Sequence, residues 1–310
     1  MKILVVGAGA TGGYFGARLA QAGRDVTFLV RAERAEHLAR HGLRIVGLGE
    51  RTVLAPNTTQ TGKIEGPYDA ILLSVKANGL EQAIDDMAPA VGPDSLIIPV
   101  LNGIRHIDAL AARFGDDAVL GGVAKVATTL NADGEIVRLA DIQSLRYGAR
   151  GDAAPARLGE LHRSLSDAGF STGLSEDIDA EMWAKWVFIA AVGAVTCLIR
   201  GAVGEIVAVP GGTAFAEAVV DECASVAAAA GHPVPAPALR QTLATVTEAG
   251  SSTTSSLYRD VATGRSAEVE QILGDLVSRA QGFGLAVPLL ELSTMQLRVH
   301  QNRIENARLV

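Results

Sequence analysis

The chain has 310 residues, which is long for one ordinary domain and fits two. Hydrophobic residues make up 48% of the sequence, so a large core is expected. The formal net charge is −7 and there is no basic stripe, which argues against a nucleic-acid partner.

Nothing in the sequence predicts a membrane segment or an export signal. The apolar run at residues 3–6 is short and ends in a glycine turn rather than at a signal-peptide cleavage site. No apolar run reaches the roughly 18–20 residues that span a bilayer, and the nearest, residues 189–199, is too short. We therefore expect a soluble, cytoplasmic protein.

The two cysteines, Cys197 and Cys223, belong to no CxxC pair and no metal-like cluster with histidine. We expect them to be buried free thiols in a reducing compartment, and we expect no metal site.

The first half alternates short β-rich runs with helix-like segments. This order predicts an α/β domain with a doubly wound, mostly parallel sheet. The expected strands are residues 2–7, 25–30, 43–46, 51–54, 69–75 and 95–99, and the expected helices are 10–22, 32–41 and 80–87. Residues 118–148 add β-like runs around a turn at 131–134.

From residue 175 onward the chain becomes rich in Ala and Val, with Gly and Pro as punctuation. The pattern predicts an all-helical domain over residues 175–310, after an α/β domain over residues 1–174. Its expected helices are residues 177–198, 213–230, 237–247, 267–282 and 288–306.

The stretch Gly7-Ala8-Gly9-Ala10-Thr11-Gly12 follows a predicted strand, opens a predicted helix and matches GxGxxG. In such a turn the first glycine permits the tight bend, the second lets the backbone approach a pyrophosphate, and the third lets the helix pack closely on the strand. The helix N-terminus then offers N–H groups and positive dipole charge to the phosphates. The pattern predicts a bound dinucleotide; the alternative is a turn that serves packing alone.

The end of the second strand indicates which dinucleotide binds. Proteins that bind NAD usually place Asp or Glu there, to hold the ribose 2′-hydroxyl. This strand instead runs into Arg31, with Arg34 one turn later. Arginine pairs with a 2′-phosphate, so NADP(H) is favoured. The alternative is that both arginines are solvated surface charges.

Two polar residues follow neighbouring strands of the predicted sheet. Lys76 comes directly after the strand at 69–75, and Asn102-Gly103 follows the strand at 95–99. Carboxyl ends of parallel strands form the ligand-binding edge of such sheets. We expect Lys76 and Asn102 to meet the nicotinamide ribose and the substrate, unless each is an ordinary loop residue.

In the helical half, Lys185 stands in an apolar stretch and shares a helix face with Ile189 and Gly193. A lysine there either extends to water or lines a cleft. If it is partly buried, its pKa should fall, which suits proton donation near neutral pH.

Farther along, Glu268 and Glu270 begin a predicted helix, where acidic residues are also ordinary helix chemistry. Ser255 and Ser256 precede them and are suited to helix capping.

Taken together, these residues resemble the ketopantoate reductase (2-dehydropantoate 2-reductase) family over nearly the whole length. The shared pattern consists of the glycine turn 7–12, Lys76, Asn102-Gly103, Trp183-Ala184-Lys185, Ser255-Ser256 through Asp260, and Glu268. The resemblance implies a Rossmann domain followed by a helical domain like that of 6-phosphogluconate dehydrogenase, with the active site in the cleft between them. It also implies reduction of ketopantoate to (R)-pantoate with NADPH, in pantothenate and coenzyme A biosynthesis.

The resemblance further implies roles for individual residues. Lys185 would donate a hydrogen bond and then a proton to the carbonyl oxygen of a 2-keto acid. Glu268 would bind the substrate hydroxyl and orient the lysine, and Ser256 and Asn102 would hold the substrate. The cofactor would be held by Gly7, Ala8, Gly9, Ala10, Thr11, Gly12, Arg31, Lys76 and Asn102.

One departure from the family pattern concerns the substrate. Many members carry Asn four and eight residues after the catalytic lysine, where this chain has Ile189 and Gly193. Either other groups replace those amides, or the enzyme reduces a less polar or bulkier keto acid or imine. A non-catalytic NADP(H)-sensing protein is a third reading, against which the pairing of Lys185 with Glu268 argues. The apolar helical half is compatible with a homodimer.

Overall fold

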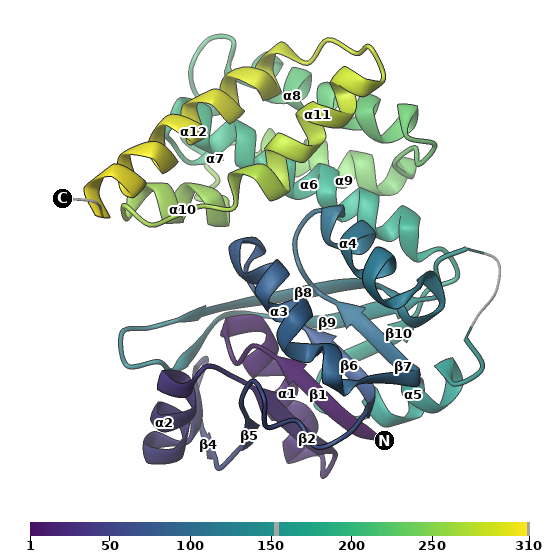
Figure 1. Ribbon diagram of the computed structural model, residues 1–310. Coiled ribbons are helices and arrows are strands. Elements are labelled where there is room, and N and C mark those ends of the chain that lie inside the picture. Colours follow the sequence, from purple (N-terminus) through teal and green to yellow (C-terminus); the bar gives the residue numbers. More distant parts are fainter. Residues whose placement is uncertain (152–154, 309–310) are drawn as a thin grey trace. The chain divides into compact units, whose positions relative to one another are not determined.

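The computed structural model describes residues 1–151 and 155–308, which form two compact units (Figure 1). The first unit comprises Met1–Leu101 and His106–Ile178. The second unit comprises the chain from Asp179 onward together with Asn102–Arg105. The second unit therefore starts at Asp179 rather than at residue 175, and it includes a short segment from the first half of the sequence.

The first sheet of the first unit is entirely parallel, in the order β5-β2-β1-β6-β7. Strand β1 lies at the centre of this sheet, and its last four residues are buried. Such continuous burial is typical of a parallel strand with helices on both faces of the sheet. The strands are β1 (Lys2–Val6), β2 (Asp25–Leu29), β5 (Asn57–Thr59), β6 (Tyr68–Leu73) and β7 (Val91–Pro99). The predicted doubly wound α/β fold is confirmed.

A second sheet, which the sequence pattern did not separate from the first, has the order β10-β9-β3-β4, with β8 antiparallel to β9. Its strands are β3 (Leu43–Gly47), β4 (Glu50–Leu54), β8 (Gly121–Leu130), β9 (Ile136–Gly148) and β10 (Ser171–Leu174). The helices of this unit are α1 (Ala10–Gln21), α2 (Ala32–His41), α3 (Leu80–Met87), α4 (Arg105–Phe114) and α5 (Leu158–Leu165), with short 3₁₀ turns η1 (Ala77–Gly79), η2 (Ala88–Ala90) and η3 (Asp116–Ala118).

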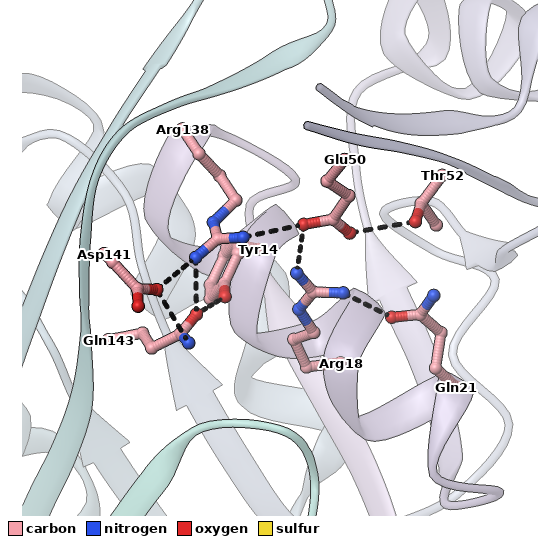
Figure 2. A network of polar contacts seen from close by, with 8 residues as sticks. All are labelled: Tyr14, Arg18, Gln21, Glu50, Thr52, Arg138, Asp141 and Gln143. Atoms are coloured by element: carbon pink, nitrogen blue, oxygen red, sulfur yellow. Dashed lines mark hydrogen bonds and ion pairs between the residues drawn. The ribbon is translucent and has the colours of Figure 1, made fainter. Parts of the chain in front are cut away.

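Helix α1, which begins in the glycine turn, packs against strands of both sheets, so most of its length is buried. A polar network fixes its far end to the second sheet (Figure 2). The guanidinium of Arg18 on α1 lies 2.5 Å from the carboxylate of Glu50 on β4, and Arg138 on β9 reaches the same oxygen at 3.1 Å. The tyrosine hydroxyl of Tyr14 donates to Gln143 on β9. The network thereby holds α1, and with it the glycine turn, in a fixed orientation.

From Asp179 onward, the described residues of the second unit form helices and connecting loops and no strand, as predicted. Its core forms around α6 and includes both buried cysteines, which are free thiols as expected. The helices are α6 (Ile178–Ile199), α7 (Val203–Val207), α8 (Gly212–Ala229), α9 (Ala236–Val246), α10 (Ser256–Ala262), α11 (Asp275–Gly282) and α12 (Pro288–Arg308).

The helix predicted over residues 267–282 is present from residue 269 but contains an irregular turn. A π-helical turn, η4 (Glu270–Gly274), precedes α11 (Asp275–Gly282). Such wide turns give no signature in hydrophobic periodicity, and they are frequent at functional sites.

Helix α6 also corrects the statement that no apolar segment is long enough to span a bilayer. It has 22 residues, and its most apolar window has a mean hydropathy of 1.8. Of that window, 67% is buried inside the protein, which is the behaviour of a core helix. The apolar run appeared too short because half-buried polar residues such as Lys185 interrupt it.

Candidate functional site

The glycine turn in the first unit is shaped by close backbone packing at its first and third glycines. Gly7 has a φ of +96°, and a Cβ there would lie 2.6 Å from the carbonyl oxygen of Ser74. A Cβ on Gly12 would overlap the carbonyl oxygen of Gly7 and lie 2.7 Å from the Ser74 Cβ. The end of β1, the start of α1 and the residue after β6 therefore meet at a distance that only glycine permits.

Gly9, the middle glycine, faces open space. Nothing lies within 4 Å of the position where its Cβ would be. It is the N-cap of α1, where, among the described residues, no side chain caps the helix and its first turn holds no acidic residue, so the N–H groups at this helix start suit an anion. A Cβ would fill the very space that a pyrophosphate needs, and the residues present therefore fit a dinucleotide.

Side chains from α2 and β8 donate hydrogen bonds to carbonyl oxygens of this turn. Arg34 on α2 donates to the Ala8 carbonyl at 3.2 Å, and the Thr128 hydroxyl on β8 donates to the Ala10 carbonyl at 3.1 Å. Arg34 is half-buried, and burial lowers the pKa of its guanidinium. Arg34 is thus a support of the turn and not a solvated surface charge. Thr11, the remaining residue of the turn, is half-buried.

Arg31 and Lys76 flank the glycine turn at the carboxyl edge of the first sheet. Both are exposed. Arg31 comes two residues after the end of β2 and Lys76 three residues after the end of β6, and these strands lie on either side of β1. The guanidinium of Arg31 approaches η1, 3.9 Å from where a Cβ of Gly79 would lie. Two cations therefore follow the strands on either side of β1, an arrangement that favours the binding of a phosphorylated ribose.

The second unit brings Asn102 and Glu268 together, although 166 residues separate them. The Asn102 side-chain amide donates to the Glu268 carboxylate at 3.3 Å, and both side chains are half-buried. Gly103, with a φ of +74°, lies so close to the carbonyl oxygen of Gln271 that a Cβ would overlap it. The Asn-Gly turn is therefore docked on the π-helical turn η4, and only glycine fits at its second position.

Lys185 lies on α6 in this same unit and is half-buried. The next residue, Trp186, is buried, and its indole N–H donates to the carbonyl oxygen of Ile272 in η4 at 2.9 Å. Helix α6 is thus fixed to the turn that follows Glu268.

The two serines differ in role. Ser255 is buried and caps α10, where its hydroxyl accepts from the N–H of Tyr258 at 2.9 Å, as expected for an N-cap. It also bonds the Thr196 hydroxyl on α6 at 2.9 Å. Ser256 is exposed and is the one of the pair that is accessible to a ligand.

Glu270 does not share the surroundings of Glu268. Both of its carboxylate oxygens accept from Arg298 at 2.7 Å, and this hydrogen bonding lowers the pKa of the Glu270 carboxyl. Glu270 is therefore an ion-pair partner for α12.

The surroundings of Ile189 and Gly193 bear on the alternative of a less polar or bulkier substrate. Gly193 is buried, and the Leu257 Cδ1 lies 2.9 Å from where a Cβ would be. The space left by the small residue is filled by leucine. The face is apolar, since Ile189 also packs against the core, but Gly193 does not enlarge it.

Sequence reasoning missed Thr128, Trp186 and Leu257. The doubled tryptophan around Lys185 is a visible signal, because large aromatic residues with an N–H usually find a buried acceptor. Thr128 and Leu257 act only through contacts with residues distant in sequence, and no local pattern marks them.

The sequence matches the ketopantoate reductase PanE/ApbA family over residues 3–151, and the C-terminal region of that family over residues 177–301. An uncharacterized oxidoreductase of Bacillus subtilis, YkpB, is 33% identical over 97% of this chain and 99% of its own length. A 2-dehydropantoate 2-reductase of Archaeoglobus fulgidus is 30% identical over 92% of each chain.

Among solved structures, D-mandelate dehydrogenase in a ternary complex with NADH and anilino(oxo)acetate superposes with a TM-score of 0.87. The superposed region covers 98% of this chain and 100% of the D-mandelate dehydrogenase chain, and the two sequences are 23% identical. This similarity concerns the fold.

Proposed function

The chain belongs to the ketopantoate reductase family of oxidoreductases, and from that membership we propose that it reduces the keto group of a 2-keto acid to a hydroxyl with NADPH. Ketopantoate is the first candidate substrate, and (R)-pantoate is then the product. Several relatives bear the name 2-dehydropantoate 2-reductase, which supports this choice.

The observation that carries the proposal is the hydrogen bond from Asn102 to Glu268 at 3.3 Å, in the unit that also holds Lys185. An amide, a carboxylate and an ammonium group from three separate chain segments gather in one unit. A keto acid offers a carbonyl oxygen and a carboxylate, so such a set of donors and acceptors suits it.

The support for NADPH lies in the first unit. Gly9 leaves room for a pyrophosphate, and Arg31 stands at the end of β2, where proteins that use NAD usually have an acidic residue. Lys76 adds a second positive charge on the other side of the turn. A bound reduced nicotinamide supplies the hydride that goes to the carbonyl carbon.

The carbonyl oxygen of the keto acid is bound and protonated by residues of this chain. Lys185, as an ammonium group, donates a hydrogen bond to the carbonyl oxygen, stabilises the negative charge that grows on it and protonates it. Glu268 accepts from Asn102 and holds the ammonium group in place. Ser256, exposed at the start of α10, and Asn102 hold the rest of the substrate.

A second substrate class has its own support. Ile189, which is partly buried, makes the face beyond Lys185 apolar at a position where an amide would otherwise bind a hydroxyl group. A 2-keto acid with an apolar side chain, such as the keto acid that corresponds to mandelate, suits that face better than ketopantoate, which carries a hydroxyl.

The test is a steady-state assay of NADPH oxidation with ketopantoate, benzoylformate and pyruvate, on the wild type and on Lys185→Ala. We expect the variant to lose about 10²–10³-fold in turnover, with the Kd for NADPH within about twofold of the wild type. Equal turnover in both proteins removes Lys185 from the role. A kcat/KM that is far higher for benzoylformate than for ketopantoate selects the apolar substrate class. Binding of NADPH without oxidation by any of the three keto acids overturns the proposal.

A further inference from the structure

A buried hydrogen bond joins the segment of Lys185 to the segment of Glu268. Trp186, 1% exposed, directly follows Lys185 on α6. Its indole N–H reaches the carbonyl oxygen of Ile272 at 2.9 Å, across 86 residues of sequence. Ile272 in turn donates its backbone N–H to the carbonyl oxygen of Glu268 at 3.2 Å. Two hydrogen bonds therefore connect the residue beside the lysine to the backbone of the glutamate.

The acceptor lies in an irregular segment. Ile272 is in the π-helical turn η4, in which the backbone departs from α-helical spacing, and such turns hold their shape only when the surroundings fix them. On one side the turn is held by Gly103, which packs against Gln271 without room for a Cβ. On the other side it is held by the indole of Trp186.

Trp186 is itself held in place from the helix that continues η4. The Arg279 guanidinium lies 5.6 Å from the Trp186 ring centroid and pairs with Asp275 at 3.2 Å. Trp183, one turn before Trp186, lies 5.8 Å from the same guanidinium and 5.0 Å from the Trp186 ring, and it also stacks on His232 with 5.5 Å between ring centroids. The two tryptophans are similarly buried, but only Trp186 has a hydrogen bond to η4 among the described contacts.

We propose that Trp186 is a positioning residue, which fixes the π-helical turn so that the Glu268 carboxylate is held in register with the Lys185 ammonium group. This inference rests on the proposed function. Loss of the indole N–H leaves the Ile272 carbonyl without this donor and lets the turn relax, while the cofactor-binding turn in the first unit is untouched. The carboxylate then supports the charged lysine less well.

The experiment compares Trp186→Phe with Trp183→Phe, since each replaces one buried indole of the same helix with a smaller ring. For Trp186→Phe we expect kcat to fall about tenfold with the better keto acid, and the KM for NADPH to stay within about twofold. The alkaline limb of its kcat–pH profile should move to lower pH, because an ammonium group that loses a carboxylate neighbour gives up its proton more readily. For Trp183→Phe we expect a kcat within about twofold and an unmoved profile.

A second measurement needs no activity. Hydrogen exchange of the peptide amides over residues 268–276 should be several-fold faster in Trp186→Phe than in the wild type, and unchanged in Trp183→Phe. Exchange equal to the wild type in Trp186→Phe overturns the proposal. So do equal losses of kcat in both variants without a shift of the pH profile, which mark a general loss of packing.

The outcomes separate this inference from the function on which it rests. If the wild type oxidises NADPH with none of the three keto acids, the proposed function fails whatever the tryptophan variants do. If Lys185→Ala is inactive while Trp186→Phe matches the wild type in kcat, pH profile and exchange, the function stands and the positioning role of Trp186 is overturned.

Discussion

The side chain of Leu257 occupies the space above Gly193, with its Cδ1 2.9 Å from the point where a Cβ would lie. Leu257 is 2% exposed and belongs to α10, directly after Ser256. The small residue on α6 and the large residue on α10 therefore form one packed pair. Neither side chain can change size without consequence for the other.

The pair should show strong coupling in a double-mutant cycle. In the Leu257→Ala background, Gly193→Ala should stabilise the protein by up to about 1 kcal/mol, because alanine is the better helix former. In the wild-type background the new methyl group meets Leu257, and overpacking of about 1–3 kcal/mol cancels or reverses that gain. Urea denaturation of the four proteins measures the coupling energy, which we expect to be at least about 1 kcal/mol. A coupling energy near zero would show that Leu257 moves aside freely.

Single substitutions in the glycine turn should affect the binding of NADPH and the stability of the fold separately. Gly9→Ala places a methyl group in open space at a φ of −86°, which alanine adopts without strain, so the melting temperature should hardly change. The methyl group should nevertheless raise the Kd for NADPH at least about tenfold, since it fills the space for the pyrophosphate.

Gly12→Ala is the matched control, because its methyl group meets the Gly7 carbonyl oxygen and the Ser74 side chain. We expect it to destabilise the protein by about 1–3 kcal/mol. Isothermal titration and thermal unfolding of both variants give the two quantities. If Gly9→Ala binds NADPH as tightly as the wild type, the turn does not hold the pyrophosphate.

Arg31 should decide between the two nicotinamide cofactors. If its exposed guanidinium pairs with a 2′-phosphate, Arg31→Ala should raise the Kd for NADPH about 10–100-fold, since hydrogen bonds between charged groups contribute about 1.5–3 kcal/mol. The Kd for NADH should stay within about twofold. Arg40→Ala, on the helix α2 that Arg31 precedes and 69% exposed in its pair with Glu36, serves as the control and should leave both constants unchanged. Parallel weakening of NADPH and NADH in Arg31→Ala would place the arginine elsewhere on the cofactor.

Local sequence patterns were enough to predict the helices and strands whose ends are marked by apolar runs and turn residues. Strand β1 and helix α1 are predicted to within a residue, because a buried apolar run and a glycine turn mark their ends. The strand β5 of three residues and the helix α10 of seven residues escaped prediction, since neither is long enough to show a period.

The same distinction applies to the candidate site, where the residues could be predicted from the sequence but their contacts could not. Residue types such as Lys185 and Glu268 stand out in their surroundings, so the sequence pointed to them. The contacts that place them do not: the bond from Trp186 to Ile272 and that from Asn102 to Glu268 join segments 86 and 166 residues apart. Such contacts depend on tertiary packing, which overrides local preference and leaves no periodic trace.

Glu50 links the pH dependence of stability to the support of helix α1. Burial acts to raise the pKa of its carboxyl, but hydrogen bonds from Arg18 and Thr52, with the Arg18 charge, outweigh burial and leave that pKa below its ordinary value of 4.5. The ionised form is therefore favoured in the folded state. Its contribution to stability is fully present above the unfolded pKa and is lost as pH falls through the folded pKa.

Glu50→Gln should accordingly lower the free energy of unfolding by about 2 kcal/mol at pH 7, where two guanidinium groups lose their carboxylate. The difference between variant and wild type should shrink as pH is lowered from about 5 towards 3, because the wild type then loses the same interaction. Glu36→Gln, 70% exposed in its pair with Arg40, should change little at either pH. Urea denaturation from pH 3 to pH 7 measures all three proteins. A deficit in Glu50→Gln that stays constant over that range would mean that its carboxylate charge does not hold α1 to the second sheet.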